Sequence, residues 1–137
     1  MTPVASLIIN ARQKEKFVAK AVRGALSQTV PCEIILSDQG STDQTLEIMH
    51  REVESYFAQR DEYEGYPPFH TVKVIECPIR GEYCMETGNK HFQYCVEQTT
   101  LPFVFQTSAD DYDLPDRVKV CMEAVEKFPC DIIGTTQ

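Results

Sequence analysis

The sequence of 137 residues predicts an α/β fold in which a mainly parallel sheet carries helices on both faces. Two observations lead to this fold class. Short apolar runs rich in β-branched residues, typical of buried strands, alternate along the chain with longer segments whose apolar residues recur every three or four positions, as on one face of a helix. Strands and helices that alternate in this way form parallel sheets, because each helix returns the chain to the same edge.

In the first half of the chain, the apolar runs 4–9 and 33–36 are expected to be strands covered on both faces. Between them, residues 14–27 place apolar side chains three and four positions apart, which predicts an amphipathic helix. The second strand leads into a turn in which Gly40 can take a positive φ and Ser41, Thr42 or Asp43 can cap a helix. That helix begins near residue 45 and runs into the fifties.

The second half continues the alternation. Residues 59–68 are polar and end in Gly and two prolines, which indicates a loop, and 70–77 alternate between apolar and polar side chains, as in a strand nearer an edge of the sheet. A helix is expected over 83–98, weakened by Gly88 in its middle. The remaining elements are a strand at 103–107, a helix over 116–128 with candidate core residues Val118, Val120, Cys121, Ala124, Val125 and Phe128, and a fifth strand that begins at 131–134.

The composition narrows the classes of protein. A net charge of −8, from 21 acidic and 13 basic residues, argues against nucleic acid as a partner, because phosphate backbones favour Lys and Arg surfaces. No apolar run reaches the roughly 18 residues of a membrane span, and the N-terminus lacks the pattern of a signal peptide. The six cysteines form no C-x-x-C pair, so we expect free, buried thiols in a cytoplasmic protein, either in solution or at the cytoplasmic face of a membrane.

Candidate functional residues follow the ends of the strands. Asp110 and Asp111 are adjacent after the strand at 103–107, where each charge is expected to raise the pKa of the other carboxyl group. Bound Mg²⁺ or Mn²⁺ would remove that conflict, whereas the alternative is an acidic surface turn with a helix cap. Asp38 and Gln39 follow the second strand. Because parallel strands end at one edge of a sheet, where ligands bind, we expect these residues to lie together.

Two separated segments carry a resemblance to a known family. SLIINARQKEKFVAKAVRGALSQTVPCEIILSDQGSTDQT resembles the opening of family 2 glycosyltransferases of the GT-A fold, in which the second strand ends in D-D-G-S-T-D. SADDYDLPDRV is similar to the D-x-D-D-x-x-x-P-D segment that follows about seventy residues later in that family. The resemblance covers nearly the whole chain. It implies a Rossmann-like nucleotide-binding half that holds a nucleotide-diphosphate sugar with Mg²⁺ or Mn²⁺.

The resemblance also implies roles for individual residues. Asp110 falls on the usual metal ligand of the family, and Asp111 lies behind it. Arg80 is expected to contact phosphate, because Gly88 stands where the family commonly has a basic residue. The expected nucleotide-binding residues are Ala11, Arg12, Asp38, Gln39, Arg80, Asn89, Ser108 and Ala109.

Transfer of the sugar to a hydroxyl of a saccharide, lipid or protein acceptor follows from the same resemblance, with a UDP-sugar expected ahead of a GDP- or dTDP-sugar. The catalytic base of the family lies in an acceptor-binding half, so we expect it beyond Gln137 and interpret residues 1–137 as one domain, cut before that half. Gln39 and Ser108 each stand where relatives have Asp. A binding or structural module without catalysis therefore stays open as an alternative. A receiver domain is disfavoured, because Asn10, Ala11 and Arg12 replace its acidic pair.

Overall fold

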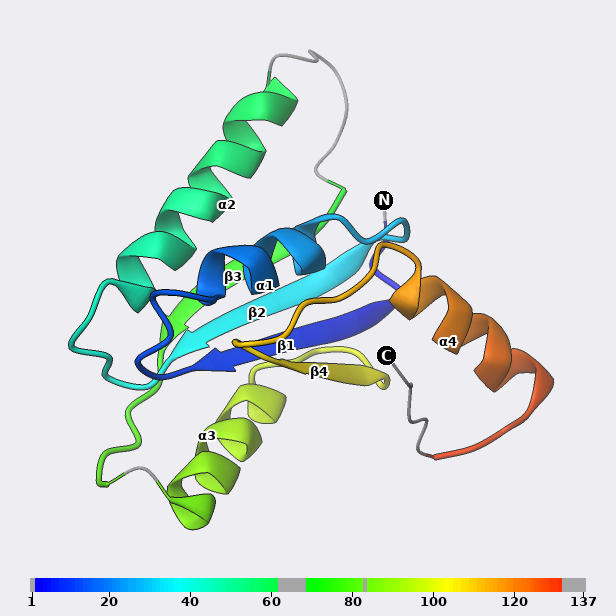
Figure 1. Cartoon of the computed structure of the whole chain (residues 1–137). Coiled ribbons are helices and arrows are strands. Elements are labelled where there is room, and N and C mark those ends of the chain that lie inside the picture. The colour runs from blue at the N-terminus through cyan, green and yellow to red at the C-terminus, as the bar shows by residue number, and fades with distance from the viewer. Residues whose placement is uncertain (1, 62–68, 83, 132–137) are drawn as a thin grey trace.

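The computed structural model describes residues 2–61, 69–82 and 84–131, and within them four strands alternate with four helices (Figure 1). The fold class and the mainly parallel sheet predicted from the sequence are confirmed, because every strand pairing is parallel. The elements are β1 (Ala5–Ala11), α1 (Val18–Leu26), β2 (Cys32–Asp38), α2 (Thr45–Asp61), β3 (Thr71–Glu76), α3 (Met85–Glu97), β4 (Val104–Ser108) and α4 (Arg117–Lys127).

The strands lie in the order β3-β2-β1-β4. Ala11 at the end of β1 pairs with Asp38 at the end of β2, and Asn10 pairs with Ser108 at the end of β4. The carboxyl ends of all four strands therefore meet at one edge. β1 and β2 are buried along nearly their whole length, whereas β3 and β4 are partly exposed at the two sides of the sheet. The third strand is thus nearer an edge than the first two, as predicted.

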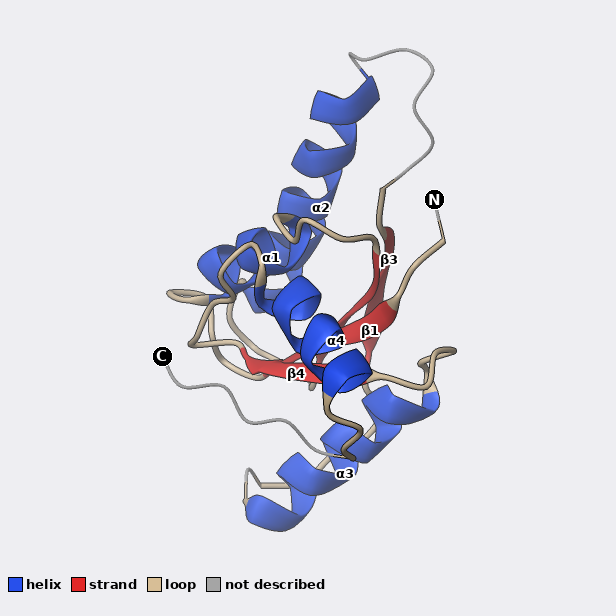
Figure 2. Ribbon diagram, turned by 90° about the vertical axis from the view of Figure 1, so that its right-hand side faces the viewer, coloured by secondary structure: helices blue, strands red, loops and turns tan. Residues whose placement is uncertain are grey.

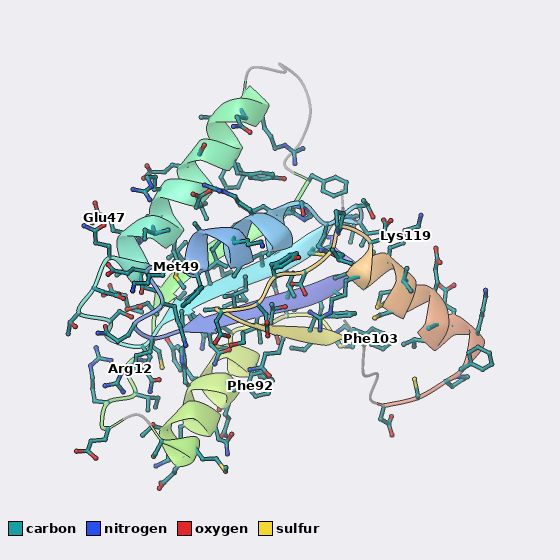
Figure 3. The ribbon with its side chains drawn as sticks, viewed as in Figure 1. Arg12, Glu47, Met49, Phe92, Phe103 and Lys119 are labelled. Carbon is teal, nitrogen blue, oxygen red and sulfur yellow. The ribbon has the colours of Figure 1, made fainter. Side chains whose placement is uncertain are left out.

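Helices cover both faces of the sheet (Figure 2). Leu7 and Ile9 of β1 face a core with Val22 of α1 and Met49 of α2, while Ile8 points to the opposite face. This alternation is the two-residue period of a strand. The core residues are Ala5, Leu7, Ile9, Ala11, Val18, Ala21, Val22, Ala25, Leu26, Cys32, Ile34, Leu36, Ile48, Met49, Ala109 and Val118 on the face of α1, α2 and α4, and Ile8, Ile35 and Cys95 on the face of α3. In Figure 3, Met49 lies above the sheet and Phe92 of α3 lies below it.

Three helices differ from the prediction. α2 continues to Asp61, so the loop predicted over 59–68 was wrong for 59–61. α1 begins at Val18 and not at residue 14, because Phe17, with φ −123° and ψ −26°, departs from helical geometry. The chain also turns at Gln13, whose φ is 54°. In α4, Val118 and Cys121 are buried, but Val120 and Phe128 are 58% and 73% exposed, so their assignment to the core was wrong. Val120 lies about 200° around the helix from Val118. The described residues end at Asp131, so the rest of the fifth strand predicted at 131–134 lies outside them.

All six cysteines are free, as predicted, and Cys32, Cys77, Cys95 and Cys121 are buried. The prediction of buried thiols was wrong for Cys84 and Cys130, which are exposed. No helix in the described ranges combines the length and the apolar character needed to cross a membrane.

Substitution by alanine is expected to have opposite effects on stability at two helical glycines. At Gly24 in α1, an added Cβ would lie 2.9 Å from both the backbone N and O of Asp113, which cannot move without the turn that precedes α4. At Gly88 in α3, an added Cβ would meet nothing within 4 Å. We expect Gly24→Ala to lower the free energy of unfolding by about 1 to 3 kcal/mol through overpacking. Gly88→Ala should raise it by about 0.5 to 1 kcal/mol through helix propensity.

Urea unfolding followed by circular dichroism measures both changes. A Gly24→Ala variant as stable as the wild type would contradict the close approach of α1 to the turn before α4.

Candidate functional site

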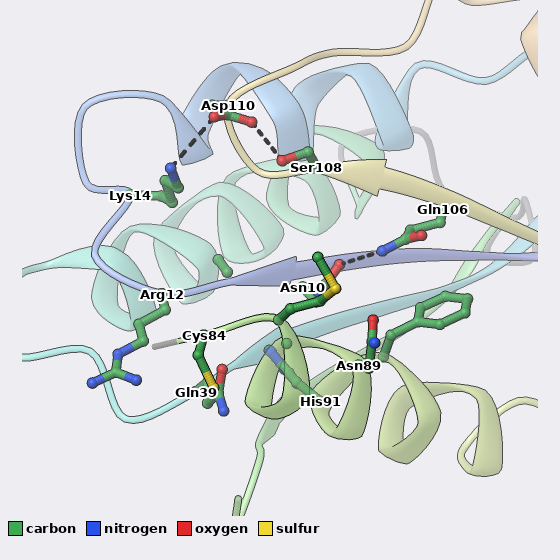
Figure 4. A pocket seen from close by; sticks show the side chains of 14 residues that line it. Asn10, Arg12, Lys14, Gln39, Cys84, Asn89, His91, Gln106, Ser108 and Asp110 are labelled. Atoms are coloured by element: carbon green, nitrogen blue, oxygen red, sulfur yellow. Dashed lines mark hydrogen bonds and ion pairs between the residues drawn. The ribbon is translucent and has the colours of Figure 1, made fainter. Parts of the chain in front are cut away.

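A pocket of about 500 Å³ lies at the carboxyl ends of β1 and β4, beside the beginning of α3 (Figure 4). After β1 the chain crosses to β2 on one side, and β4 later returns to the other side, so the strand order reverses at β1. This reversal is the position at which open parallel sheets bind ligands. The wall opposite the sheet comes from the first turns of α3.

The structure brings six of the predicted residues together in the lining of this pocket. They come from the carboxyl ends of β1 and β4, from the segments that follow β1, β2 and β4, and from α3, whereas the segment after β3 contributes none of the predicted residues. The six are Ala11, Arg12, Gln39, Asn89, Ser108 and Asp110. The other predicted residues lie outside the lining. Asp38 is buried directly before Gln39, Arg80 donates a hydrogen bond to the Cys77 carbonyl oxygen, Ala109 is buried in the core, and Asp111 is exposed.

The turn after β2 holds two buried oxygen atoms without a partner. Asp38 is 2% exposed, and its Oδ2 accepts the N–H of Ser41 at 3.0 Å, while its Oδ1 has no hydrogen bond. Gln39 is 3% exposed and turns its amide Nε2 toward the Thr87 carbonyl oxygen, which leaves Oε1 unpaired. A buried acceptor without a donor costs about 1 to 3 kcal/mol. Gln39 lines the pocket, so its unpaired Oε1 is suited to accept a hydrogen bond from a ligand, and the unpaired Oδ1 of Asp38 belongs to the residue directly before it.

A glutamine that the sequence reasoning missed fixes this turn. Gln13 has a positive φ, and its Oε1 accepts the N–H groups of Thr42 and Asp43, while its Nε2 donates to Thr42 Oγ1 at 2.9 Å. The N–H of Gln13 donates to Ser41 Oγ at 2.9 Å. Of the three predicted caps, Asp43 accepts the N–H of Thr45 at 3.0 Å. A positive φ at a glutamine has no sequence pattern that reveals it, so no signal in the sequence indicates that Gln13 fixes this turn.

The turn after β4 presents one carboxylate to the pocket. Asp110 accepts a hydrogen bond from Ser108 Oγ at its Oδ1, and its Oδ2 lies 3.4 Å from Lys14 Nζ (Figure 4). The Ser108 hydroxyl and the Lys14 ammonium hold the pKa of Asp110 below its usual value. The sequence argument that Asp111 would raise this pKa is thus wrong, because a hydroxyl and an ammonium stabilise the charge. Sequence reasoning did not identify Lys14.

Behind this turn, a buried acidic residue anchors the chain. Asp113 accepts hydrogen bonds from Thr107 Oγ1 at 2.6 Å and from Arg117. Arg117 also donates to Thr107 Oγ1 at 2.8 Å, and Gln28 of the segment after α1 donates to the Leu114 carbonyl oxygen at 2.8 Å. These contacts place Ser108 and Asp110 without any contribution from a ligand.

His91 of α3 and Cys84, the residue directly before α3, complete the wall of the pocket. His91 is buried and hydrogen-bonded to Ser37 Oγ at 2.8 Å, and burial lowers its pKa to about 4, so it is neutral at pH 7. Cys84 is exposed at the start of α3, and hydrogen bonds from Thr87 hold the pKa of its thiol below the usual value.

The oxygen atoms of Asp110 and Ser108 are the kind of ligand that Mg²⁺ and Mn²⁺ prefer. Within residues 2–61, 69–82 and 84–131, no group of three or more His, Cys, Asp or Glu side chains could hold a metal ion. A cation at Asp110 would therefore take its other ligands from water and from a bound anion. Mg²⁺ commonly binds through one or two carboxylates and substrate phosphates, so the residues fit such an ion.

Comparison with known proteins gives consistent matches over this whole region. The sequence profile of Glycosyl transferase family 2 matches residues 6–137. Chondroitin synthase from Escherichia coli is 27% identical over 126 residues, which are 91% of this chain and 16% of that protein.

Solved structures share the fold. S. aureus TarS 1-349 in complex with UDP-GlcNAc matches with a TM-score of 0.68 at 20% identity, over 98% of this chain and 37% of that chain. The mannosyltransferase PcManGT from Pyrobaculum calidifontis, in complex with GDP-Man and Mn²⁺, matches with a TM-score of 0.70 at 16% identity, over 91% of this chain and 33% of that chain.

The role of Gln13 predicts an unusual order of stability between two variants. Gln13→Ala and Gln13→Gly both remove the side-chain hydrogen bonds to Thr42 and Asp43, but only glycine adopts a positive φ without strain. We expect both variants to be less stable than the wild type, and Gln13→Ala to be less stable than Gln13→Gly by about 1 kcal/mol.

Urea unfolding gives the order, and hydrogen exchange of the amides of Thr42 and Asp43 should accelerate in both variants. A Gln13→Ala variant more stable than Gln13→Gly would contradict this account of the turn.

Proposed function

This chain belongs to glycosyl transferase family 2, and from that premise we propose that it binds the nucleotide-diphosphate sugar of a glycosyltransferase reaction. The observation that carries the proposal is the pair of unpaired buried acceptors, Asp38 Oδ1 and Gln39 Oε1, at the same sheet edge as the carboxylate of Asp110. One side of the site suits a donor-rich nucleoside, and the other suits a diphosphate with a cation.

The nucleoside is assigned to the turn after β2. Uracil carries an imide N–H, and ribose carries hydroxyl groups. A uridine nucleotide can therefore donate hydrogen bonds to Asp38 and Gln39. The glutamine accepts such a bond through a neutral carbonyl oxygen, which gives a weaker bond than a carboxylate would. The UDP-GlcNAc complex of TarS supports a UDP-sugar, and the GDP-Man complex of PcManGT keeps a GDP-sugar open.

The diphosphate is assigned to the loops after β1 and β4. Asp110 and Ser108 would hold Mg²⁺ or Mn²⁺, and Arg12 and Asn89 line the same pocket. The structure of PcManGT in complex with GDP-Man and Mn²⁺ supports a divalent cation. A divalent cation there would stabilise the negative charge that grows on the departing nucleotide diphosphate. The residues of the chain orient the donor so that an acceptor hydroxyl can attack its sugar.

Asp110 is the one carboxylate lining the pocket among the described residues, and the proposal uses it at the diphosphate. We therefore assign no residue as the base that deprotonates the acceptor hydroxyl. The proposed acceptor is a saccharide, a lipid or a protein. The chain spans 16% of chondroitin synthase and 37% of TarS 1-349, so the acceptor is not assigned from either relative.

Ser108 favours a second candidate function. Because Ser108 has a hydroxyl where relatives have a carboxylate, Asp110 is the single charged ligand that a cation would find here among the described residues. A module that binds a nucleotide without a cation would not need a second carboxylate. The two functions differ in how strongly nucleotide binding depends on the cation.

Isothermal titration with UDP, GDP and dTDP, with and without Mn²⁺, tests the proposal. We expect Mn²⁺ to strengthen UDP binding, and Asp110→Asn to weaken UDP binding in Mn²⁺ by about tenfold or more, equal to about 1.4 kcal/mol. Asp111→Asn should weaken it by less than about threefold, because Asp111 does not line the pocket. Glu126→Gln, an exposed carboxylate on α4, is the control for the change in charge.

If the affinity for UDP changes neither on addition of Mn²⁺ nor in Asp110→Asn, the result would favour the module without catalysis. Failure of UDP, GDP and dTDP alike to bind would overturn the proposed function.

A further inference from the structure

Lys14 belongs to the loop after β1, yet its side chain reaches the turn after β4. Asn10 and Ser108 are paired across the sheet, so the two loops leave the same edge side by side. Lys14 Nζ lies 3.4 Å from Asp110 Oδ2, and both residues line the pocket (Figure 4). The ion pair thus spans the position where the strand order reverses.

The backbone of Lys14 is fixed, whereas its side chain has room to move. Its N–H donates to Thr45 Oγ1 at 2.8 Å, and its carbonyl oxygen accepts the N–H groups of Phe17 at 3.0 Å and Val18 at 2.9 Å. The side chains of Lys14 and Asp110 are 34% and 45% exposed. A lysine carries its charge on a flexible stem with rotatable donors, so the ammonium can turn toward another anion while its Cα stays in place.

The two oxygens of Asp110 face different partners. Oδ1 accepts the hydroxyl hydrogen of Ser108, and Oδ2 faces the ammonium of Lys14. A cation that takes Oδ2 must compete with Lys14, because two positive charges on one carboxylate oxygen repel each other. The ion pair is therefore in competition with the metal ligand role of Asp110.

Lys14 is also well placed for a diphosphate. Arg12 and Lys14 are the cationic side chains that line the pocket in the described part of the chain. Arg12 donates to the Gly81 carbonyl oxygen at 2.9 Å, on the side of α3, whereas Lys14 lies next to the carboxylate assigned to the cation. A phosphate beside that cation would lie within reach of Lys14.

Resting on the proposed function, we infer that Lys14 exchanges its Asp110 partner for the diphosphate of the donor when the nucleotide and a divalent cation bind. When the ammonium moves away, Oδ2 of Asp110 is free to bind the cation. Once the cation occupies Oδ2, the ammonium of Lys14 is free to bind the phosphate oxygens. Binding of the nucleotide and binding of the cation then strengthen each other, and linkage makes this coupling reciprocal.

Lys14→Gln tests the exchange through two binding constants. The affinity for Mn²⁺ alone, measured by electron paramagnetic resonance of the free ion, should rise by about threefold or more, because Lys14 no longer competes. The affinity for UDP in saturating Mn²⁺, measured by isothermal titration, should fall by about tenfold, because the diphosphate loses a cation. Lys14→Arg should keep UDP affinity within about threefold of the wild type.

Lys16→Gln is the matched control, since Lys16 is exposed in the same loop and the change in net charge is identical. Equal effects of Lys14→Gln and Lys16→Gln on both constants would reduce Lys14 to general electrostatics and overturn the inference. A weaker Mn²⁺ affinity in Lys14→Gln would also overturn it. In both cases UDP binding by the wild type would leave the proposed function intact, whereas its absence would remove both.

Discussion

The parallel pairing of β1 with strands on both of its sides is the constraint on which the site depends. β1 meets Asp38 at the end of β2 through Ala11, and Ser108 at the end of β4 through Asn10. Any shift in either register would separate the unpaired acceptors after β2 from the carboxylate after β4. Side chains of β1 pack against α1 and α2 on one face and against α3 on the other, and a slip of one residue would exchange the two sets of partners.

Polar contacts then fix the loops that leave this edge. Gln13 holds the turn after β2 through backbone N–H groups, and Asp113 with Arg117 holds the turn after β4. These bonds are formed by the chain itself, so little ordering is left for a ligand to impose. Preorganisation of this kind favours binding, because less conformational freedom is lost on association. Lys14 is the exception, because its backbone is held by hydrogen bonds but, among the described residues, its side chain is held by the ion pair with Asp110 alone.

The fold, and the meeting of six predicted residues in one pocket, followed from the sequence, because strand and helix periodicities are local and parallel strands end together. The choice between Asp110 and Asp111 needed a family resemblance, since the two are equivalent in composition. Gln13 and Lys14 could not be predicted, because one depends on a positive φ and the other on a contact across the sheet. The placement of Arg80 at phosphate came from sequence order, and in the structure its guanidinium turns to a backbone carbonyl outside the pocket lining.

Paramagnetic broadening of backbone amide signals by Mn²⁺ in the presence of UDP tests the central claim most directly. The account predicts that the signals of 108–111 and of Arg12 and Lys14 broaden first, and that Asp110→Asn abolishes the effect. Unchanged signals at this edge, or broadening centred on the groove lined by Arg23 and Glu52 between α1 and α2, would contradict it.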